Sequence, residues 1–200
     1  MDKKIIVAGY IGLEGSLKIA KDKEEELKQY FSRYFSNQIK ECEKCLVSSK
    51  NLDGMKLRQS ITLEEVKSFQ RESIKERILE EKLEENVIVP LGETGAFTSL
   101  WSALWNLCEM WKCGVEIEFS QIPIRQETIE ICQFAGLNPY QLSSKGSYLI
   151  FTSRAEEVMD ELKLREIPAN IIGETTDKRE RLIKRGDYIR HLPRPVIGGK

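Results

Sequence analysis

The chain has 200 residues, of which 40% are hydrophobic and 32% are charged, and its formal net charge is -1. A chain of this length can bury a core without disulfides, and the balanced charge gives no general attraction to nucleic acid or anionic membranes. No apolar run approaches the roughly 20 residues that span a bilayer, and the N-terminal residues lack the apolar core of a secretory signal. We therefore expect a soluble, cytoplasmic protein with no nucleic-acid or membrane partner.

The first residues predict a strand followed by one long helix. Residues 3–8 are apolar and β-branched, and the glycines that follow have GxxGxxG spacing, which differs from the dinucleotide-binding fingerprint. Residues 18–39 predict a helix with four aromatic side chains on one face, namely Tyr30, Phe31, Tyr34 and Phe35. We expect this aromatic face to pack in the core.

The next segment, at about residues 48–86, is rich in charge. Residues 48–60 predict a loop, and Thr62 with Glu65 forms the pattern of a capping box. A long helix is then expected over residues 63–85, with only a thin apolar stripe. The charges predict a solvated face, and a partner-binding helix is the alternative.

From residue 87 onward, strands and helices alternate. A strand at 87–89 precedes a helix at 96–113 that carries all three tryptophans and is apolar over so wide an arc that it must pack on two sides. Gly114 is expected to stop this helix, as Gly136 stops the next one. Strands are predicted at VEIEF, SYLIFT and ANIIGETT. One helix, which Gly136 ends, lies between the first two strands, and a second, which Ser153 begins, lies between the last two. A hairpin that turns at Arg185–Gly186 follows.

This alternation predicts an α/β (α+β) fold, a layered mixed sheet with packed helices. We expect one domain over residues 1–200, with the charged helical segment at about 48–86 as a divergent part.

The five cysteines lie in apolar segments, which predicts buried free thiols. Cys42 and Cys45 have CxxC spacing, but no second ligand pair lies nearby, and the single histidine, His191, is far away in sequence. A metal or redox role for this pair is the alternative. No metal site is therefore assigned.

Candidate ligand-binding residues lie in the turn LGETGAF and comprise Gly92, Glu93, Thr94 and Gly95. Free backbone amides where a strand meets a helix can bind a phosphate or carboxylate. However, the turn contains no lysine or arginine, and Glu93 would repel a phosphate unless magnesium lay between them. Both a ligand site and a simple tight turn therefore remain open.

No catalytic residue is assigned. The sequence offers no histidine-based nucleophile system, and Glu116 and Glu118 share a strand face that we interpret as the solvated face. The GETT sequence at 173–176 is similar to GETG at 92–95, but a match of four residues does not by itself indicate a shared role.

The order of these segments resembles the C-terminal domain of the aminoimidazole ribonucleotide (AIR) synthase-related family, with hydrogenase expression/formation (maturation factor) proteins as its nearest branch. The resemblance rests on IIVAGYIGLEG, on GETGAF with its aromatic helix, on IPANIIGETT, and most of all on IPIRQETIEICQFAGLNPYQLSSKGSYLIF. It covers most of residues 3–45 and 87–192.

This resemblance implies an AIR synthase C-terminal domain-like sandwich, dimers, and ATP-dependent chemistry that activates an oxygen as a phosphate ester. Three departures limit the activity that we expect. The family's N-terminal domain, with most contacts to ATP and magnesium, has no counterpart here, and the family's His-Asp pair is replaced at Val89–Pro90. The related hydrogenase protein also ends in a carbamoyl-carrying cysteine, whereas this chain ends in IGGK.

The functional expectation is a stand-alone domain, a pseudoenzyme that is not catalytic alone and acts by binding a ligand or partner, in hydrogenase or cofactor maturation. One alternative is half of a split ATP-dependent maturation enzyme, and another is a structural or sensor module. No cofactor is expected for the chain alone, and Mg-ATP only with a partner domain. The expected partner is a second copy, giving a homodimer, or a protein that supplies an N-terminal ATP-binding domain.

Overall fold

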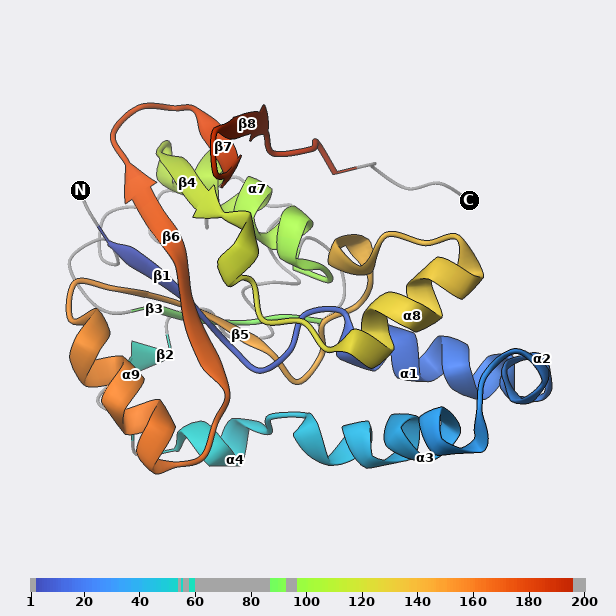
Figure 1. Cartoon of the computed structure of the whole chain (residues 1–200). Coiled ribbons are helices and arrows are strands. Elements are labelled where there is room, and N and C mark those ends of the chain that lie inside the picture. Colours follow the sequence, from blue (N-terminus) through green and yellow to red (C-terminus); the bar gives the residue numbers. More distant parts are fainter. Residues whose placement is uncertain (1–2, 54, 56–57, 60–86, 93–96, 196–200) are drawn as a thin grey trace.

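The computed structural model describes residues 3–53, 55, 58–59, 87–92 and 97–195 (Figure 1). Its strands form one eight-stranded sheet in the order β2-β3-β5-β1-β6-β4-β7-β8. The strands are β1 Lys4–Ala8, β2 Arg58–Gln59, β3 Val87–Pro90, β4 Gly114–Glu118, β5 Tyr148–Thr152, β6 Ala169–Thr176, β7 Arg181–Arg185 and β8 Tyr188–His191. The pairs β2–β3 and β4–β7 are parallel and the other neighbours are antiparallel, so the predicted mixed sheet is confirmed.

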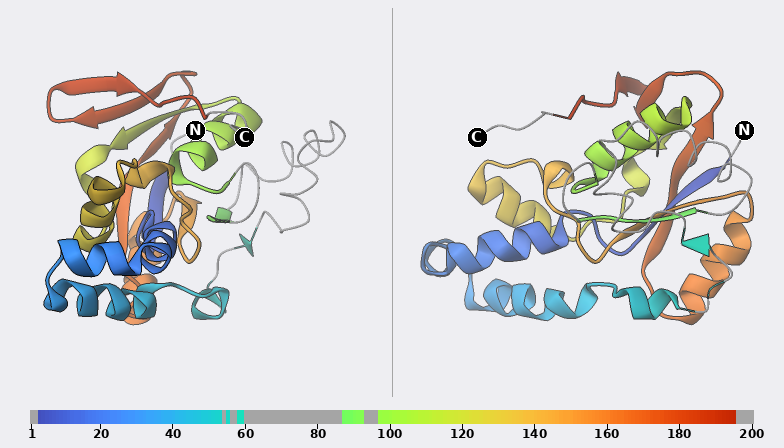
Figure 2. Two further views of the ribbon diagram at one scale, coloured as in Figure 1. Left: turned by 90° about the vertical axis from the view of Figure 1, so that its right-hand side faces the viewer. Right: turned by 180° about the vertical axis from the view of Figure 1, so that it is seen from behind.

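Helices pack on this sheet and at one end of it. The α-helices are α1 Leu13–Asp22, α2 Glu24–Tyr30, α3 Arg33–Cys42, α4 Ser49–Leu52, α7 Leu100–Trp111, α8 Gln126–Ala135 and α9 Ala155–Leu164. Short 3-10 helices in the described residues are η1 Glu43–Cys45, η2 Phe119–Gln121 and η3 Pro139–Gln141. Figure 2 shows the β7–β8 hairpin on the opposite side of the molecule from α3 and α4.

The tryptophan-bearing helix α7 covers one face of the sheet. Its apolar side chains are buried on several sides, as predicted, and the Trp111 ring meets Phe151 of β5 edge-on, with ring centroids 4.7 Å apart. The helix begins later than expected, at Leu100, because the Ser99 hydroxyl accepts the Ser102 amide and caps the first turn.

The prediction that Gly114 ends this helix is wrong. Lys112 ends it in the left-handed conformation, with φ 52°, and Gly114 is already the first residue of β4. A Cβ atom at Gly114 would lie 1.9 Å from the carbonyl oxygen of Lys178, so glycine is needed there for a close chain crossing rather than for a helix stop. Gly136, by contrast, does end α8 in the left-handed conformation, as predicted.

The described helices cover the opposite face of the sheet only in part. Ile6 of β1 and Ile150 of β5 pack under α9, whose Val158 and Leu162 are buried in the same cluster. The helix α9 begins at Ala155 rather than at Ser153, and the preceding Thr152 hydroxyl accepts the Arg154 amide at 2.9 Å. Toward β6, β4 and β7, polar side chains take over this face.

The single helix predicted over residues 18–39 is wrong, because three helices occupy this region. The chain breaks at Lys23 and again at Phe31, and the Ser32 hydroxyl accepts the Phe35 amide at 3.2 Å to begin α3. A serine that can cap a new helix competes with continuation of the old one.

The break also divides the aromatic face. Phe31 and Phe35 stack with centroids 4.3 Å apart and pack in a small cluster with α8, so core packing is confirmed for them. Tyr30 and Tyr34 are 68% and 74% exposed, so the same prediction is wrong for the tyrosines.

The loop expected at 48–60 contains α4 and the short strand β2. The capping box at Thr62 and Glu65 and the helix expected at 63–85 lie outside the described residues. The later strands and the terminal hairpin are confirmed. Within the part of the chain that the structure describes, no helix has the length and apolar character required to cross a bilayer.

Candidate functional site

Gly92, the first predicted ligand-binding residue, closes a turn at the end of β3. It has φ 80°, and its amide donates to the Phe97 carbonyl at 3.0 Å. A Cβ atom here would lie 2.0 Å from the Lys145 amide nitrogen, so the contact between two loops requires glycine. Glu93, Thr94 and Gly95 lie outside the described residues. The turn therefore accounts for Gly92, while the predicted ligand contacts of its three neighbours stay a prediction.

The glycine-rich loop before α1 uses its amides within the protein. The amides of Gly9 and Ile11 donate to the carbonyls of Pro168 and Pro123, at 2.7 and 2.9 Å. The Gly15 amide donates to the Ser143 carbonyl at 3.0 Å. These amides are therefore not available to a phosphate, although the loop lies at a helix N-terminus.

Ser144 joins this loop to the turn that follows β3. Its hydroxyl is fully buried and accepts the Gly12 amide at 2.9 Å, while its own amide donates to the Thr98 carbonyl at 3.0 Å. The Ser147 hydroxyl donates a hydrogen bond to the Tyr10 carbonyl at 2.8 Å. We call this arrangement the serine junction, and it holds three distant loops in one fixed arrangement.

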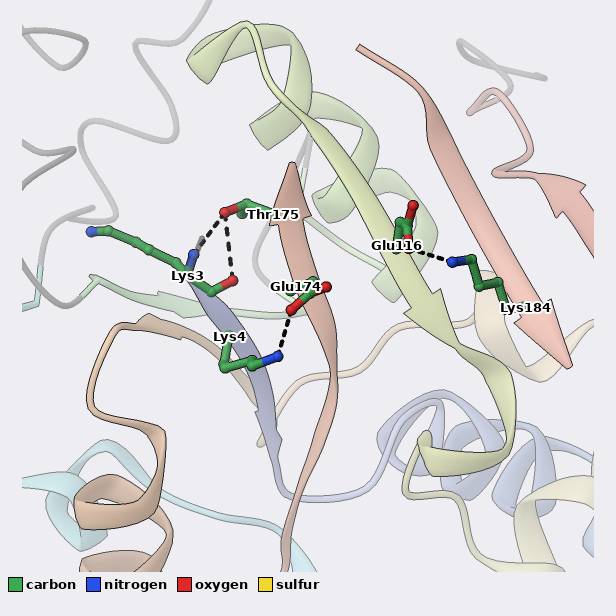
Figure 3. Close-up of polar contacts among 6 residues, drawn as sticks. All are labelled: Lys3, Lys4, Glu116, Glu174, Thr175 and Lys184. Carbon is green, nitrogen blue, oxygen red and sulfur yellow. Dashed lines mark hydrogen bonds and ion pairs between the residues drawn. The ribbon is translucent and has the colours of Figure 1, made fainter. Parts of the chain in front are cut away.

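A row of four charges crosses the exposed part of the sheet and forms the best-defined polar surface (Figure 3). Glu174 of β6 and Glu116 of β4 stand directly opposite each other in the register. Lys4 of β1 pairs with Glu174, and Lys184 of β7 pairs with Glu116. These four residues line a shallow hollow of about 270 Å³, which we call the open face.

Backbone features of β6 position this row. The register between β1 and β6 shifts at Ile5–Ile6, and Thr175 then bonds twice to the Lys3 backbone: its hydroxyl accepts the Lys3 amide at 3.0 Å, and its amide donates to the Lys3 carbonyl at 2.9 Å. A Cβ atom at Gly173 would lie 2.0 Å from the Glu116 carbonyl oxygen, so glycine lets β4 approach. Residues 173–176 therefore belong to the strand β6.

The charges of the open face are balanced within the row. Two carboxylates opposite each other would repel, but a lysine beside each one neutralises it. All four side chains are one-third to one-half exposed, so each ion pair contributes little to stability. The solvated-face interpretation of Glu116 is confirmed. Sequence reasoning missed the two ion pairs, Glu116 with Lys184 and Glu174 with Lys4.

The CxxC cysteines lie at the end of α3. Cys42 is buried, and burial raises its pKa to about 11, although the positive charge of Arg125 opposes this. Cys45 is half-buried, lines a hollow of about 620 Å³ beside α9, and lies 3.7 Å from an Arg125 guanidinium nitrogen. All five cysteines are free thiols, and in the described ranges no three metal-ligating side chains gather closely enough to hold a metal ion.

Comparison with known proteins indicates which protein family this chain resembles. Residues 98–185 match the family model described as AIR synthase related protein, C-terminal domain. The matched stretch includes α7 and the β4, β6 and β7 strands of the open face. The resemblance to the C-terminal domain of AIR synthase-related proteins is therefore confirmed.

Three particular proteins refine this similarity. Carbamoyl dehydratase HypE of Rhodobacter capsulatus is 35% identical over 57 residues, which is 28% of this chain and 17% of that protein. Phosphoribosylformylglycinamidine synthase subunit PurL of Methanothermobacter marburgensis is 30% identical over 123 residues, which is 58% of this chain and 16% of that protein. A crystal structure of a HypE–HypF complex matches with a TM-score of 0.59 at 17% identity, over 96% of this chain and 53% of that one.

These matches confirm the resemblance to the hydrogenase maturation branch. They also show that this chain spans only part of each relative, about half in the case of the HypE structure. At 17% identity, that structural likeness describes the fold alone.

Proposed function

We propose that this chain is a single AIR synthase-related C-terminal-like domain that binds a partner through the open face and is not catalytic on its own. The observation that carries this proposal is the row of Lys4, Glu174, Glu116 and Lys184, which crosses four neighbouring strands on an exposed sheet face. A fixed charge pattern, in which two neighbouring carboxylates are flanked by two lysines, favours one partner over others, because a mismatched partner would leave charges unpaired.

Two further observations support a role without catalysis. The amides at Gly9, Ile11, Gly12 and Gly15, where a phosphate would otherwise bind, are occupied by protein acceptors. The open face presents lysines paired with carboxylates and lacks, within the described residues, a histidine or thiol that could act as base or nucleophile.

The pathway that we propose is hydrogenase or cofactor maturation in the cytoplasm, on the basis of the similarity to HypE. Since a relative crystallises in a HypE–HypF complex, a maturation protein or a second copy of this chain is the proposed partner. Mg-ATP enters this proposal only where a partner supplies an ATP-binding domain.

The test immobilises this chain, captures binding proteins from a lysate of the native cell, and identifies the captured proteins by mass spectrometry. The double variant Glu116→Lys, Glu174→Lys reverses the centre of the charge row, so the specific partner should be recovered about tenfold less, as expected when opposite charges become like charges. The control Glu156→Lys makes the same type of change at an exposed site on α9. Equal recovery by wild type and the double variant would reject the open face as the docking surface.

The second candidate function is half of a split ATP-dependent maturation enzyme. The match spans about half of the chain in the HypE–HypF structure, and this candidate function places the remaining half on a separate protein. Mixing this chain with a candidate N-terminal-domain protein should then raise ATP hydrolysis above the sum of the two parts. Hydrolysis that does not exceed this sum would count against the split enzyme.

A further inference from the structure

The terminal hairpin β7–β8 carries more positive charge than the rest of the chain. It contains four cationic side chains and one carboxylate, Asp187, whereas the whole chain has a net charge of -1. Arg181 pairs with Glu109 and Lys184 pairs with Glu116. For Arg185 and Arg190, no carboxylate of the described residues lies within ion-pair distance.

These two arginines are neighbours on one face of the hairpin. In the register Ile183 is opposite Arg190 and Arg185 is opposite Tyr188, so the two guanidinium groups lie diagonally across the two strands. Like charges at such positions repel each other unless an anion lies between them. This arrangement therefore favours the binding of a negatively charged group.

An aromatic stack holds both guanidinium groups in place. Arg185 and Arg190 lie over the Phe119 ring, at 6.0 and 5.5 Å from its centroid. The Phe119 ring packs against Tyr140 at 4.9 Å, and Tyr140 stacks on the buried Trp101 at 5.3 Å. Cation–π contacts to a supported ring orient arginines before a ligand arrives, which lowers the entropy cost of binding.

The strand β8 also has a free edge among the described strands, because it is the last one in the order of the sheet. The Leu192 amide donates to the Arg181 carbonyl at 2.8 Å, so this side of the strand faces β7. Amides alternate along a strand, which directs the amides of Ile189 and His191 toward the free edge. Tyr188 and Ile189 are 75% and 57% exposed. The edge thus offers main-chain partners and apolar contacts together.

We propose that an extended acidic segment of a partner protein adds to β8 as a new strand and places its carboxylates against Arg185 and Arg190. Main-chain pairing supplies affinity in such strand addition, and the side chains supply specificity. A second copy of this chain fits poorly, because its own arginines would meet this pair. This inference does not rest on the open face, which lies on the other side of the sheet from Arg185 and Arg190.

The probe is a fluorescein-labelled dodecapeptide that alternates glutamate with threonine, followed by fluorescence anisotropy with the full chain. The same peptide with glutamine in place of glutamate should bind about tenfold more weakly, because charge-assisted bonds to arginine are lost. The variant R185Q/R190Q should lose about tenfold for the acidic peptide. The control R33Q/R154Q removes the same charge from exposed sites at the start of α3 and just before α9, and it should bind normally.

The backbone contribution is tested separately. Ile189→Pro removes one outward amide and leaves the β7 side of the strand unchanged, so it should also weaken binding about tenfold. Ile189→Ala removes the side chain but keeps the amide, and it should bind within about threefold of wild type. Normal binding by Ile189→Pro would overturn strand addition. If inorganic polyphosphate bound as tightly as the acidic peptide, the proposal of an acidic protein segment would be wrong. It would also be wrong if the wild-type chain formed a dimer that Ile189→Pro dissociates.

Discussion

At the scale of single residues, two glycines with positive φ occupy their positions for different reasons. Gly92 and Gly136 both have positive φ, at 80° and 67°. A Cβ atom added at Gly136 would have no neighbouring atom within 4 Å, whereas at Gly92 the Lys145 backbone fills the corresponding space. Glycine therefore ends a helix at Gly136 and permits a close contact between two loops at Gly92, and only the fold distinguishes these roles.

We predict that Gly136→Ala lowers the free energy of unfolding by about 1 kcal/mol, the cost of a left-handed alanine. Gly92→Ala should cost about 3 kcal/mol or more, because the steric clash with Lys145 adds to that cost. Urea unfolding of both variants measures the difference. Equal losses would show that the loops do not approach each other as described.

Burial also sets a pH dependence at Cys132. Burial raises its pKa to about 11, from an ordinary value of 9.0. The unfolded thiol ionises first as pH rises, so the stabilisation is complete below pH 9.0 and is lost through pH 11. The free energy of unfolding should therefore fall more steeply over this range in wild type than in Cys132→Ala, as urea titrations at several pH values would reveal. Parallel curves would contradict the buried thiol.

At the scale of elements, local patterns predicted most strands and helices and the end of α8 at Gly136, but not the other helix ends or the strand pairing. The alternation in VEIEF was sufficient to predict a strand, and the wide apolar arc of the tryptophan-bearing helix was sufficient to predict a buried helix. Burial of one or more faces produces a regular spacing of apolar residues in the sequence. The break at Ser32 was missed, since serine caps a helix only when the chain turns there. The partners Lys4 and Glu174 are 170 residues apart, and no local pattern encodes that register.

The serine junction is the element-scale feature that we expect to matter most for stability. Ser144→Ala leaves the buried Gly12 amide without its acceptor, which should lower the free energy of unfolding by about 1–3 kcal/mol. Ser120→Ala, at an exposed site, should change it by less than about 0.5 kcal/mol. Thermal or urea unfolding of the two variants compares them, and similar values would argue against the junction.

At the scale of the whole molecule, two surfaces face outward from one scaffold. The open face carries paired charges, whereas the β7–β8 hairpin carries two arginines that have no carboxylate partner in the described part of the chain. The sequence resemblance predicted the scaffold, since the family pattern is spread over many segments. Neither surface could be predicted, because each forms only when strands distant in sequence become neighbours.

Isothermal titration of the isolated chain with Mg-ATP, followed by an assay of released phosphate, tests most directly whether this domain acts by binding alone. We predict no tight binding and no turnover, because the amides of the loop before α1 are occupied and the open face lacks a nucleophile among the described residues. Tight binding with turnover by the isolated chain would contradict that prediction.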